Sequence, residues 1–120
     1  MIVGIGLDIV EMDRMKDIME RRSNIIDRIL SFREKEIFNK LRDSRQLEFL
    51  AGRFAAKEAF SKALGTGIGK TVGFLDIEIL HDEKGKPIIV QNITSDRVFV
   101  TITHSKKFAA AQVIIESLSS

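Results

Sequence analysis

The chain opens with a strict alternation of side-chain types. Apolar residues at the odd positions from Val3 to Ile9 alternate with Gly4, Gly6 and Asp8. A two-residue period predicts a strand, because successive side chains of a strand point to opposite faces. The two glycines permit close approach of another backbone to this strand. Asp8 is the one charged residue in this apolar stretch.

The middle of the chain changes to helical spacing of apolar residues. Ser31 and Glu34 have the spacing of a capping box at a helix start. Ser44 can cap the longest helix, and Gly65 supplies its C-terminal stop. This longest helix is apolar on nearly all sides, so we expect it to be buried on two faces and to form the spine of the fold. The segments expected to be helical are residues 13–22, 31–41 and 44–64.

The last half returns to strand-like patterns separated by turns. The residues from Asp82 to Pro87 have turn composition, and the residues from His104 to Lys107 turn the chain again. Helices followed by hairpins predict an α+β protein with an antiparallel sheet packed on a long central helix. At 120 residues, we expect residues 1–120 to form one domain. The expected strands are residues 75–79, 88–90, 98–102 and 109–115.

Composition narrows the chemistry. The chain has no cysteine, which excludes disulfides, thiol catalysis and cysteine-bound zinc, and which fits a reducing cytoplasm. The first residues lack the features of a signal peptide, and no apolar run is long enough to span a membrane. The net charge of +2, from 19 basic and 17 acidic residues, is too balanced to predict nucleic-acid binding. We therefore expect a cytoplasmic protein that binds neither nucleic acid nor membrane.

Glu58 is the most informative single residue. On a helical wheel it lies close to Phe54, Leu47 and Leu50, within an apolar stripe of the longest helix. A carboxylate in such surroundings is costly unless a cation or hydrogen bonds compensate it. Two interpretations stay open, an ordinary i,i+4 ion pair with Lys62 and a functional carboxylate. Asp8 is a second carboxylate in an apolar run, and together the two suit Mg²⁺ bound beside a phosphate.

A glycine-rich segment, Gly65 to Thr71, follows the longest helix. It does not fit a phosphate-binding P-loop, because Leu64 stands where that pattern requires glycine and because a helix precedes the segment. Its glycines still permit backbone amides to approach an anion. Other enzyme classes fit less well. A sugar site commonly uses tryptophan or tyrosine, which are absent, and the adjacency of His104 and Ser105 does not make a catalytic pair.

Five segments of the chain form a recognisable set: GIGLDIVE at residues 4–11, FAAKEA at 54–59, KALGTG at 62–67, THS at 103–105 and AQV at 111–113. Together they resemble the short bacterial type of 4′-phosphopantetheinyl transferase. They occur in the order and at the spacing of that family, and the match spans the whole chain. Two departures are conservative, Thr103 where the family usually has serine and Lys86 where arginine is common. Lysine cannot make the bidentate phosphate contact of arginine.

The resemblance implies an enzyme that moves 4′-phosphopantetheine from coenzyme A to apo acyl carrier protein, for fatty acid biosynthesis. It also implies a homotrimer with active sites between subunits. Asp8 and Glu58 match the family's magnesium ligands, which makes Mg²⁺ the implied cofactor, and Lys62 matches its phosphate-contacting lysine. The implied catalytic residues are Asp8, Glu58, Lys62 and His104. The implied nucleotide-binding residues are Arg53, Lys62, Gly65, Thr66, Gly67, Lys86 and His104.

The first helix matches the element that docks the carrier protein, through Arg14, Arg21 and Arg22. Acidic residues are interleaved with these arginines, so a solvated mixed-charge surface is the competing interpretation. The sequence leaves the proton acceptor open between Glu58 and a metal-bound water. A small oligomeric nucleotide-binding protein without transferase activity remains the alternative function.

Overall fold

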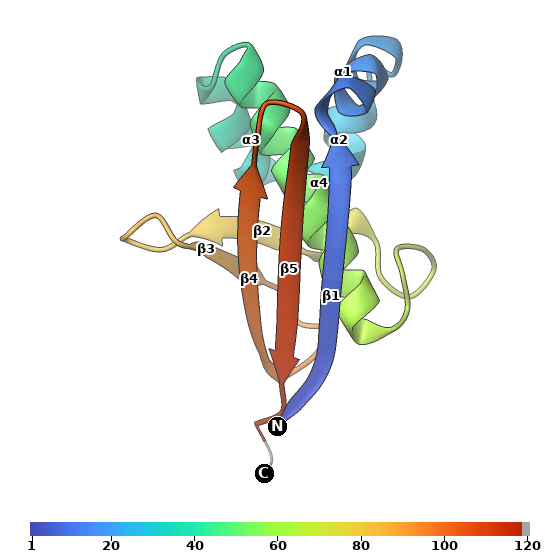
Figure 1. Cartoon of the computed structure of the whole chain (residues 1–120), viewed down its shortest axis with the longest axis vertical. Coiled ribbons are helices and arrows are strands. Elements are labelled where there is room, and N and C mark those ends of the chain that lie inside the picture. Colours follow the sequence, from blue (N-terminus) through green and yellow to red (C-terminus); the bar gives the residue numbers. More distant parts are fainter. Residues whose placement is uncertain (119–120) are drawn as a thin grey trace.

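A three-stranded antiparallel sheet lies across one long helix in the computed structural model, which describes residues 1–118 (Figure 1). The sheet has the order β1-β5-β4, so its central strand comes from the end of the chain and pairs with the first strand. The expected α+β architecture, an antiparallel sheet on a central helix, is therefore confirmed. The elements of this layer are β1 (Ile2–Glu11), β4 (Arg97–His104), β5 (Phe108–Glu116) and the helix α4 (Ser44–Leu64).

The remaining elements cover α4 on its other sides. In Figure 1 the short helices gather at one end of the molecule, and a two-stranded hairpin projects sideways. No helix among residues 1–118 is both long and apolar enough to cross a membrane. These elements are α1 (Met12–Arg21), α2 (Ile25–Ile29), α3 (Phe32–Lys40), the 3₁₀ helix η1 (Phe74–Asp76), β2 (Glu78–His81) and β3 (Pro87–Val90).

Helix α4 is buried on two sides, as its sequence predicts. One face packs against the three-stranded sheet, where Ala56, Phe60 and Val113 belong to the same cluster of buried side chains. The opposite side packs against α1 and its neighbours, where Leu50, Met15 and Ile29 form a second cluster. The helix therefore fixes the sheet and the helical end of the molecule relative to one another.

The glycines of β1 allow this strand to lie directly on α4. A Cβ atom added to Gly6 would collide with the carbonyl oxygen of Ala59, and one added to Gly4 would collide with that of Ala63. The strand therefore turns its glycine side toward the helix. Its apolar side chains point away and remain largely exposed, at 56–64% for Val3, Ile5, Leu7 and Ile9.

The alternating apolar residues of the last half of the chain predict a surplus apolar surface for assembly, on Val98, Val100, Ile102, Val113 and Ile115. The structure corrects this prediction. Val100, Val113 and Ile115 are buried, and Val98 and Ile102 pack against the same cluster. The exposed apolar surface lies instead on β1, because the glycine side of that strand takes the core position.

Several boundaries differ from the sequence-based expectations. Ser31 and Glu34 form the predicted capping box of α3, and Gly65 ends α4 in the left-handed conformation with φ of 85°. Ser44 is wrongly predicted as a cap, because it is already helical and Asp43 is the N-cap, with φ of 51°. The expected strand at residues 75–79 begins only at residue 78, since its first part forms η1, and the five-residue α2 has no counterpart among the expected elements.

Candidate active site

Asp8 and Glu58 line one cavity between β1, α1 and α4. Asp8 lies on the same side of β1 as Gly6, so it faces α4, and Glu58 comes from the part of α4 that this strand crosses. Both side chains are half-buried. The structure thus brings together two carboxylates that stand 50 positions apart in the chain. The cavity has a volume of about 350 Å³, and its lining residues are Asp8, Ile9, Val10, Glu11, Arg14, Met15, Ile18, Phe54, Glu58 and Phe108.

Lys62 forms an ion pair with Asp8. Its Nζ donates to Asp8 Oδ1 at 2.9 Å and to the carbonyl oxygen of Leu7 at 3.1 Å. The i,i+4 ion pair between Lys62 and Glu58, which the sequence left open, is not among the ion pairs of residues 1–118. Lys62 therefore bridges from α4 to β1, and Glu58 is left facing the cavity without that partner.

The electrostatic environment of Glu58 favours an added cation. Burial raises the pKa of Glu58 above its ordinary value, the negative charge of Asp8 raises it further, and Lys62 opposes both effects. Two carboxylates in a partly apolar cavity repel one another, and one lysine neutralises one of the two charges. A divalent cation between them would relieve this repulsion.

The donor set of this cavity fits Mg²⁺. That ion prefers oxygen ligands and is usually bound through one or two carboxylates, with water and substrate phosphate completing its coordination. No group of three or more histidine, aspartate or glutamate side chains arranged to hold a metal occurs in the described part of the chain. A site with only two carboxylates suits an ion that shares its coordination with a phosphate ligand, and it does not suit a closed structural metal centre.

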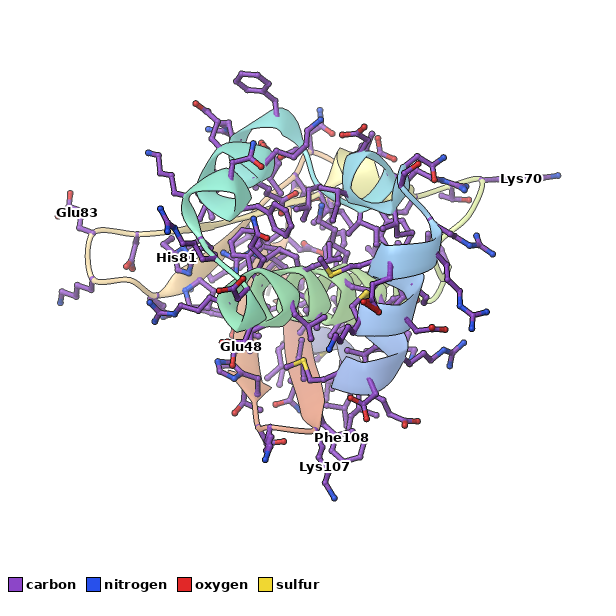
Figure 2. The ribbon with its side chains drawn as sticks, turned by 90° about the horizontal axis from the view of Figure 1, so that it is seen from above. Glu48, Lys70, His81, Glu83, Lys107 and Phe108 are labelled. Atoms are coloured by element: carbon purple, nitrogen blue, oxygen red, sulfur yellow. The ribbon has the colours of Figure 1, made fainter. Side chains whose placement is uncertain are left out.

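His104 lies apart from the carboxylates. It ends β4 and pairs with Ala109 of β5, whereas Asp8 of β1 pairs with Ala111 on the other edge of β5. Two strand spacings, roughly 10 Å across the sheet, and two residues, roughly 7 Å along it, therefore separate the backbones of His104 and Asp8. His104 Nδ1 lies 3.6 Å from Glu48 Oε2. Figure 2 shows Glu48 on α4, and Lys107 and Phe108 at the outer edge of the molecule, where the turn from β4 leads into β5.

A second cavity surrounds His104. It has a volume of about 510 Å³ and lies between the start of α4 and the turn that joins β4 to β5. Within one chain, then, His104 and the pair Asp8 and Glu58 face different cavities. The residues that line the second cavity are Met12, Ser44, Leu47, Glu48, His104, Ser105 and Lys106.

Arg53 is buried on a different face of α4. Its side chain is 6% exposed, its guanidinium lies 3.9 Å from the ring centre of Phe49, and its Nη2 lies 3.4 Å from both ring nitrogens of His81. Its buried Nε has no hydrogen-bond partner within the described residues. Burial lowers the pKa of Arg53 to about 10, and the charge of Glu34 opposes that shift. The structure does not bring Arg53 to the cavity lined by Asp8 and Glu58, which we call the carboxylate cavity. A role of Arg53 in nucleotide binding therefore stays a prediction.

The glycine-rich loop after α4 uses its amides internally. The backbone N–H of Gly65 donates to Lys62 O, and those of Thr66 and Gly67 both donate to Ser61 O. These amides cap the C-terminus of α4, so they do not form the anion-binding arrangement that the glycines permit. Lys70 extends from the same loop at the periphery (Figure 2). Nucleotide binding by residues 65–67 stays a prediction. Because their amides are already used, this contact would come from side chains or apolar atoms.

The other predicted binding residues occupy exposed positions. Lys86 lies in the turn between β2 and β3, where its amide donates to Asp82 Oδ1. Arg14 projects from α1 and lines the carboxylate cavity. Arg21 pairs with Asp17 at 3.0 Å, and Arg22 follows directly as the C-cap of α1. Of the three arginines, Arg14 is the one placed beside Asp8 and Glu58.

Sequence reasoning missed a buried ion pair behind the site. Lys57, next to Glu58 in the chain, donates from Nζ to Glu34 Oε1 at 2.6 Å and to the carbonyl oxygen of Ile29 at 2.6 Å. Both side chains of the pair are completely buried. Glu34 also accepts from the amides of Ser31 and Ile79. The adjacent charges of Lys57 and Glu58 resemble a surface pattern, and the signal that could have found the pair is the nearly all-round apolar helix around Lys57.

The fold and this site define a class of protein. The family model of the 4′-phosphopantetheinyl transferase superfamily matches residues 4–115, which include Asp8, Glu58 and Lys62. The sheet across the central helix is thus the fold of a chain that belongs to the 4′-phosphopantetheinyl transferase superfamily.

Individual relatives narrow the class. The chain is 57% identical to a holo-[acyl-carrier-protein] synthase of Geobacillus sp. over 99% of this chain and 100% of that protein, and 59% identical to one of Bacillus pumilus over the full length of both. A crystal structure of a Bacillus anthracis holo-(acyl-carrier-protein) synthase, in complex with CoA (3′,5′-ADP), matches with a TM-score of 0.93 and 52% identity over 98% of each chain. The chain therefore belongs to the holo-[acyl-carrier-protein] synthase family of this superfamily.

Proposed function

We propose that this chain transfers the 4′-phosphopantetheine group of coenzyme A to a serine of an apo acyl carrier protein and releases 3′,5′-ADP. The observation that carries this proposal is the cavity in which Asp8 and Glu58 face one another with Lys62 beside them. The cavity occurs in a chain that matches holo-[acyl-carrier-protein] synthases from end to end.

The reaction exchanges one phosphorus–oxygen bond for another. The serine oxygen of the carrier forms a bond to the β-phosphorus of coenzyme A, and the bond from that phosphorus to the oxygen of 3′,5′-ADP breaks. The serine hydroxyl loses its proton, and negative charge develops on the leaving phosphate. The protein has little covalent chemistry to do, so its task is to position the two substrates and to neutralise charge.

The residues of the cavity fit this task. Asp8 and Glu58 would hold Mg²⁺, which supplies positive charge beside the pyrophosphate when it is bound. Lys62 holds its ammonium group against Asp8, on a flexible and half-exposed side chain, and would neutralise charge on the leaving phosphate. Arg14 lines the same cavity and would face the incoming carrier protein.

We also propose that the active chain is a homotrimer. The support is the exposed apolar side of β1, where Val3, Ile5, Leu7 and Ile9 are each more than half exposed. A contiguous apolar surface of this kind commonly marks a protein interface. Within one chain, the cavity around His104 and the carboxylate cavity are separate. In a trimer, the His104 cavity of one subunit would lie beside the carboxylate cavity of its neighbour. Arg53, the segment 65–67, Lys86 and His104 are proposed to contact the nucleotide in that assembly.

The carrier protein is proposed to dock on α1. Arg14 and Arg21 are seven residues apart, so they share one face of this helix, and the half-buried Met19 provides adaptable apolar packing nearby. Such a surface suits an acidic helical partner, as the family resemblance implies. We expect the Michaelis constant for the carrier to rise with salt more than that for coenzyme A, because salt screens exposed charges. The family resemblance and the absence of cysteine support a role in fatty acid biosynthesis in the cytoplasm.

Mass spectrometry of a carrier protein incubated with this protein, coenzyme A and Mg²⁺ tests the proposal. We expect the carrier to gain the mass of one phosphopantetheine group, and a carrier whose acceptor serine is replaced by alanine to gain none. The alternative, a nucleotide-binding protein without transferase activity, predicts coenzyme A binding with an unchanged carrier. Omitting Mg²⁺ and adding a chelator separates a metal-dependent transferase from a metal-independent one.

A further inference from the structure

Lys62 is ion-paired with Asp8, the carboxylate to which a divalent cation in this cavity would bind. Its Nζ lies 2.9 Å from Asp8 Oδ1 and is held there by a second hydrogen bond to Leu7 O at 3.1 Å. The Asp8 side chain is 15% exposed, so few other directions are open to a ligand, whereas the Lys62 side chain is 50% exposed. The lysine can leave the pair for solvent or for another anion far more easily than Asp8 can turn away.

The charges around the cavity sharpen this competition. Asp8, Glu58 and Glu11 contribute the acidic groups, and Arg14 and Lys62 are the basic groups near them. An ammonium group within hydrogen-bond distance of a carboxylate oxygen and a divalent cation on the same carboxylate repel one another strongly at such short range. A cation can bind to Asp8 fully only if the ammonium group of Lys62 moves away.

We propose that Lys62 competes with the divalent cation for Asp8, so that the protein alone holds the cation weakly and a phosphate-bearing substrate tightens it by drawing Lys62 away. This inference rests on the proposed function, because it takes the carboxylate pair as a cation site and a phosphate as the second partner of Lys62. It gives Lys62 a role before the reaction, in which it couples the binding of one ligand to the binding of the other.

Thermodynamic reciprocity follows from this arrangement. If the phosphate-bearing ligand raises the affinity for the cation by some factor, the cation raises the affinity for that ligand by the same factor. Part of the coupling comes from direct contact between cation and phosphate and does not need Lys62. The remaining part comes from the exchange of partners by Lys62 and should disappear when its charge is removed.

Titration of the substrate-free protein with Mn²⁺, followed by electron paramagnetic resonance of the free ion, tests the competition directly. Lys62→Met should bind Mn²⁺ about three- to fivefold more tightly than the wild type, the range expected when a partly exposed ion pair is lost. Lys62→Arg keeps the charge and should resemble the wild type. Lys40→Met removes an equal charge from the exposed end of α3 and should also resemble it.

The contrary results are equally definite. If Lys62→Met binds Mn²⁺ no more tightly than Lys40→Met, or binds it less tightly, the competition is refuted. The same holds if neither the wild type nor Lys62→Met binds Mn²⁺. Asp8→Asn should abolish binding, and an unchanged affinity in that variant would place the ion elsewhere and overturn the proposal. None of these Mn²⁺ titrations uses coenzyme A. Their results therefore test the competition between Lys62 and the cation even if the protein proves to have no transferase activity.

The second arm measures coupling by calorimetry. The affinity for coenzyme A is measured with and without saturating Mn²⁺, and the gain in affinity should be larger for the wild type than for Lys62→Met. Equal gains would overturn the part of the proposal that concerns substrate, even if the first arm succeeds. If coenzyme A does not bind at all, the proposed function is refuted. The Mn²⁺ titration of the substrate-free protein still decides whether Lys62 competes with the cation for Asp8.

Discussion

Lys57 and Glu34 form an ion pair in which neither side chain has any exposed surface, with Lys57 Nζ 2.6 Å from Glu34 Oε1. The pair joins four elements, because Lys57 belongs to α4 and bonds the end of α2, while Glu34 belongs to α3 and bonds the amide of Ile79 in β2. Burial lowers the pKa of Lys57, and the charge and hydrogen bond of Glu34 oppose that shift. The pair anchors the helix that carries Glu58.

We expect Lys57→Met to lower the free energy of unfolding by about 3–5 kcal/mol, because it leaves the Glu34 carboxylate buried without its counter-charge. The double variant Lys57→Met, Glu34→Gln removes both charges and should be more stable than the single variant. Urea unfolding of both proteins measures the difference. A single variant as stable as the wild type, or a double variant less stable than the single one, contradicts this account.

The carboxylate pair should be needed for turnover and not for folding. Asp8→Asn and Glu58→Gln keep the shape of each side chain and remove its charge. We expect each to reduce kcat/KM for the carrier protein by about 100-fold or more, roughly 2.7 kcal/mol of transition-state stabilisation, with a melting temperature near that of the wild type. Phosphopantetheine transfer and thermal unfolding are measured on the same samples. A Glu58→Gln protein that melts earlier and turns over normally would make Glu58 a structural residue.

Gly6→Ala should destabilise the protein, because the added methyl group meets the carbonyl oxygen of Ala59 on the α4 backbone. A backbone atom in a packed helix cannot move aside cheaply, so we expect a loss of about 1–3 kcal/mol or more. Gly69→Ala is the matched control, since nothing lies within 4 Å of a Cβ atom at that position. Denaturant unfolding compares the two variants, and equal stabilities would show that β1 can shift away from α4.

Glu78 should contribute a pH-dependent part of the stability. Hydrogen bonds from Arg33 and Ser31 lower the pKa of Glu78 below its ordinary value of 4.5. The folded state therefore binds this proton less readily than the unfolded state, so the stabilisation is complete above the unfolded pKa and is lost as the pH falls through the folded pKa. The difference in unfolding free energy between wild type and Glu78→Gln should be constant above about pH 5.5 and should shrink below pH 4.5.

The control for this titration is Glu83→Gln, which removes a carboxylate from the exposed turn between β2 and β3 (Figure 2). The pH profile of that variant is the reference with which the profile of Glu78→Gln is compared. If Glu78→Gln and Glu83→Gln show the same profile, the network around Glu78 does not hold its charge as described.

Subunit exchange tests the proposed trimer and the division of the site between chains. Asp8→Ala and His104→Ala proteins should each be inactive, and mixing them after mild dissociation should restore part of the activity. The reason is that His104 and Asp8 face separate cavities in one chain. Sedimentation of the wild type measures its oligomeric state. A fully active monomer, or a mixture that stays inactive while forming mixed trimers, would contradict the shared site.

The sequence predicted the secondary structure of β1 better than it predicted which side of this strand faces α4. Alternation at the start of the chain predicts β1 correctly, yet it does not say which side of the strand meets α4. Glycines decide that point, because they allow the two backbones to touch, and the apolar side chains such as Ile5 are left outside. The short helix α2 escaped prediction because five residues are too few to show a helical period.

Local hydrogen bonds explain another difference. Leu75 and Asp76 continue the alternation of β2, but Asp76 Oδ2 accepts from the amide of Gly73 and the segment closes into a 3₁₀ turn. The candidate site was predictable in part, since Asp8 and Glu58 are conspicuous charges in apolar runs. The family resemblance implied that these two carboxylates meet at one metal. The pairing of Lys62 with Asp8 depends on how β1 crosses α4, and neither the resemblance nor the spacing predicted it.

Lys57 and Glu58 are neighbours in the chain, but about 100° of helical rotation separates them, so one points into the interior and the other into the cavity. Genetic variation at these two adjacent codons should therefore produce different kinds of defect. Substitutions of Lys57 would reduce the amount of folded protein in the cell. Substitutions of Glu58 would leave that amount unchanged and would abolish the activity. A growth-based selection would score both alike, and a parallel measurement of protein abundance would tell them apart.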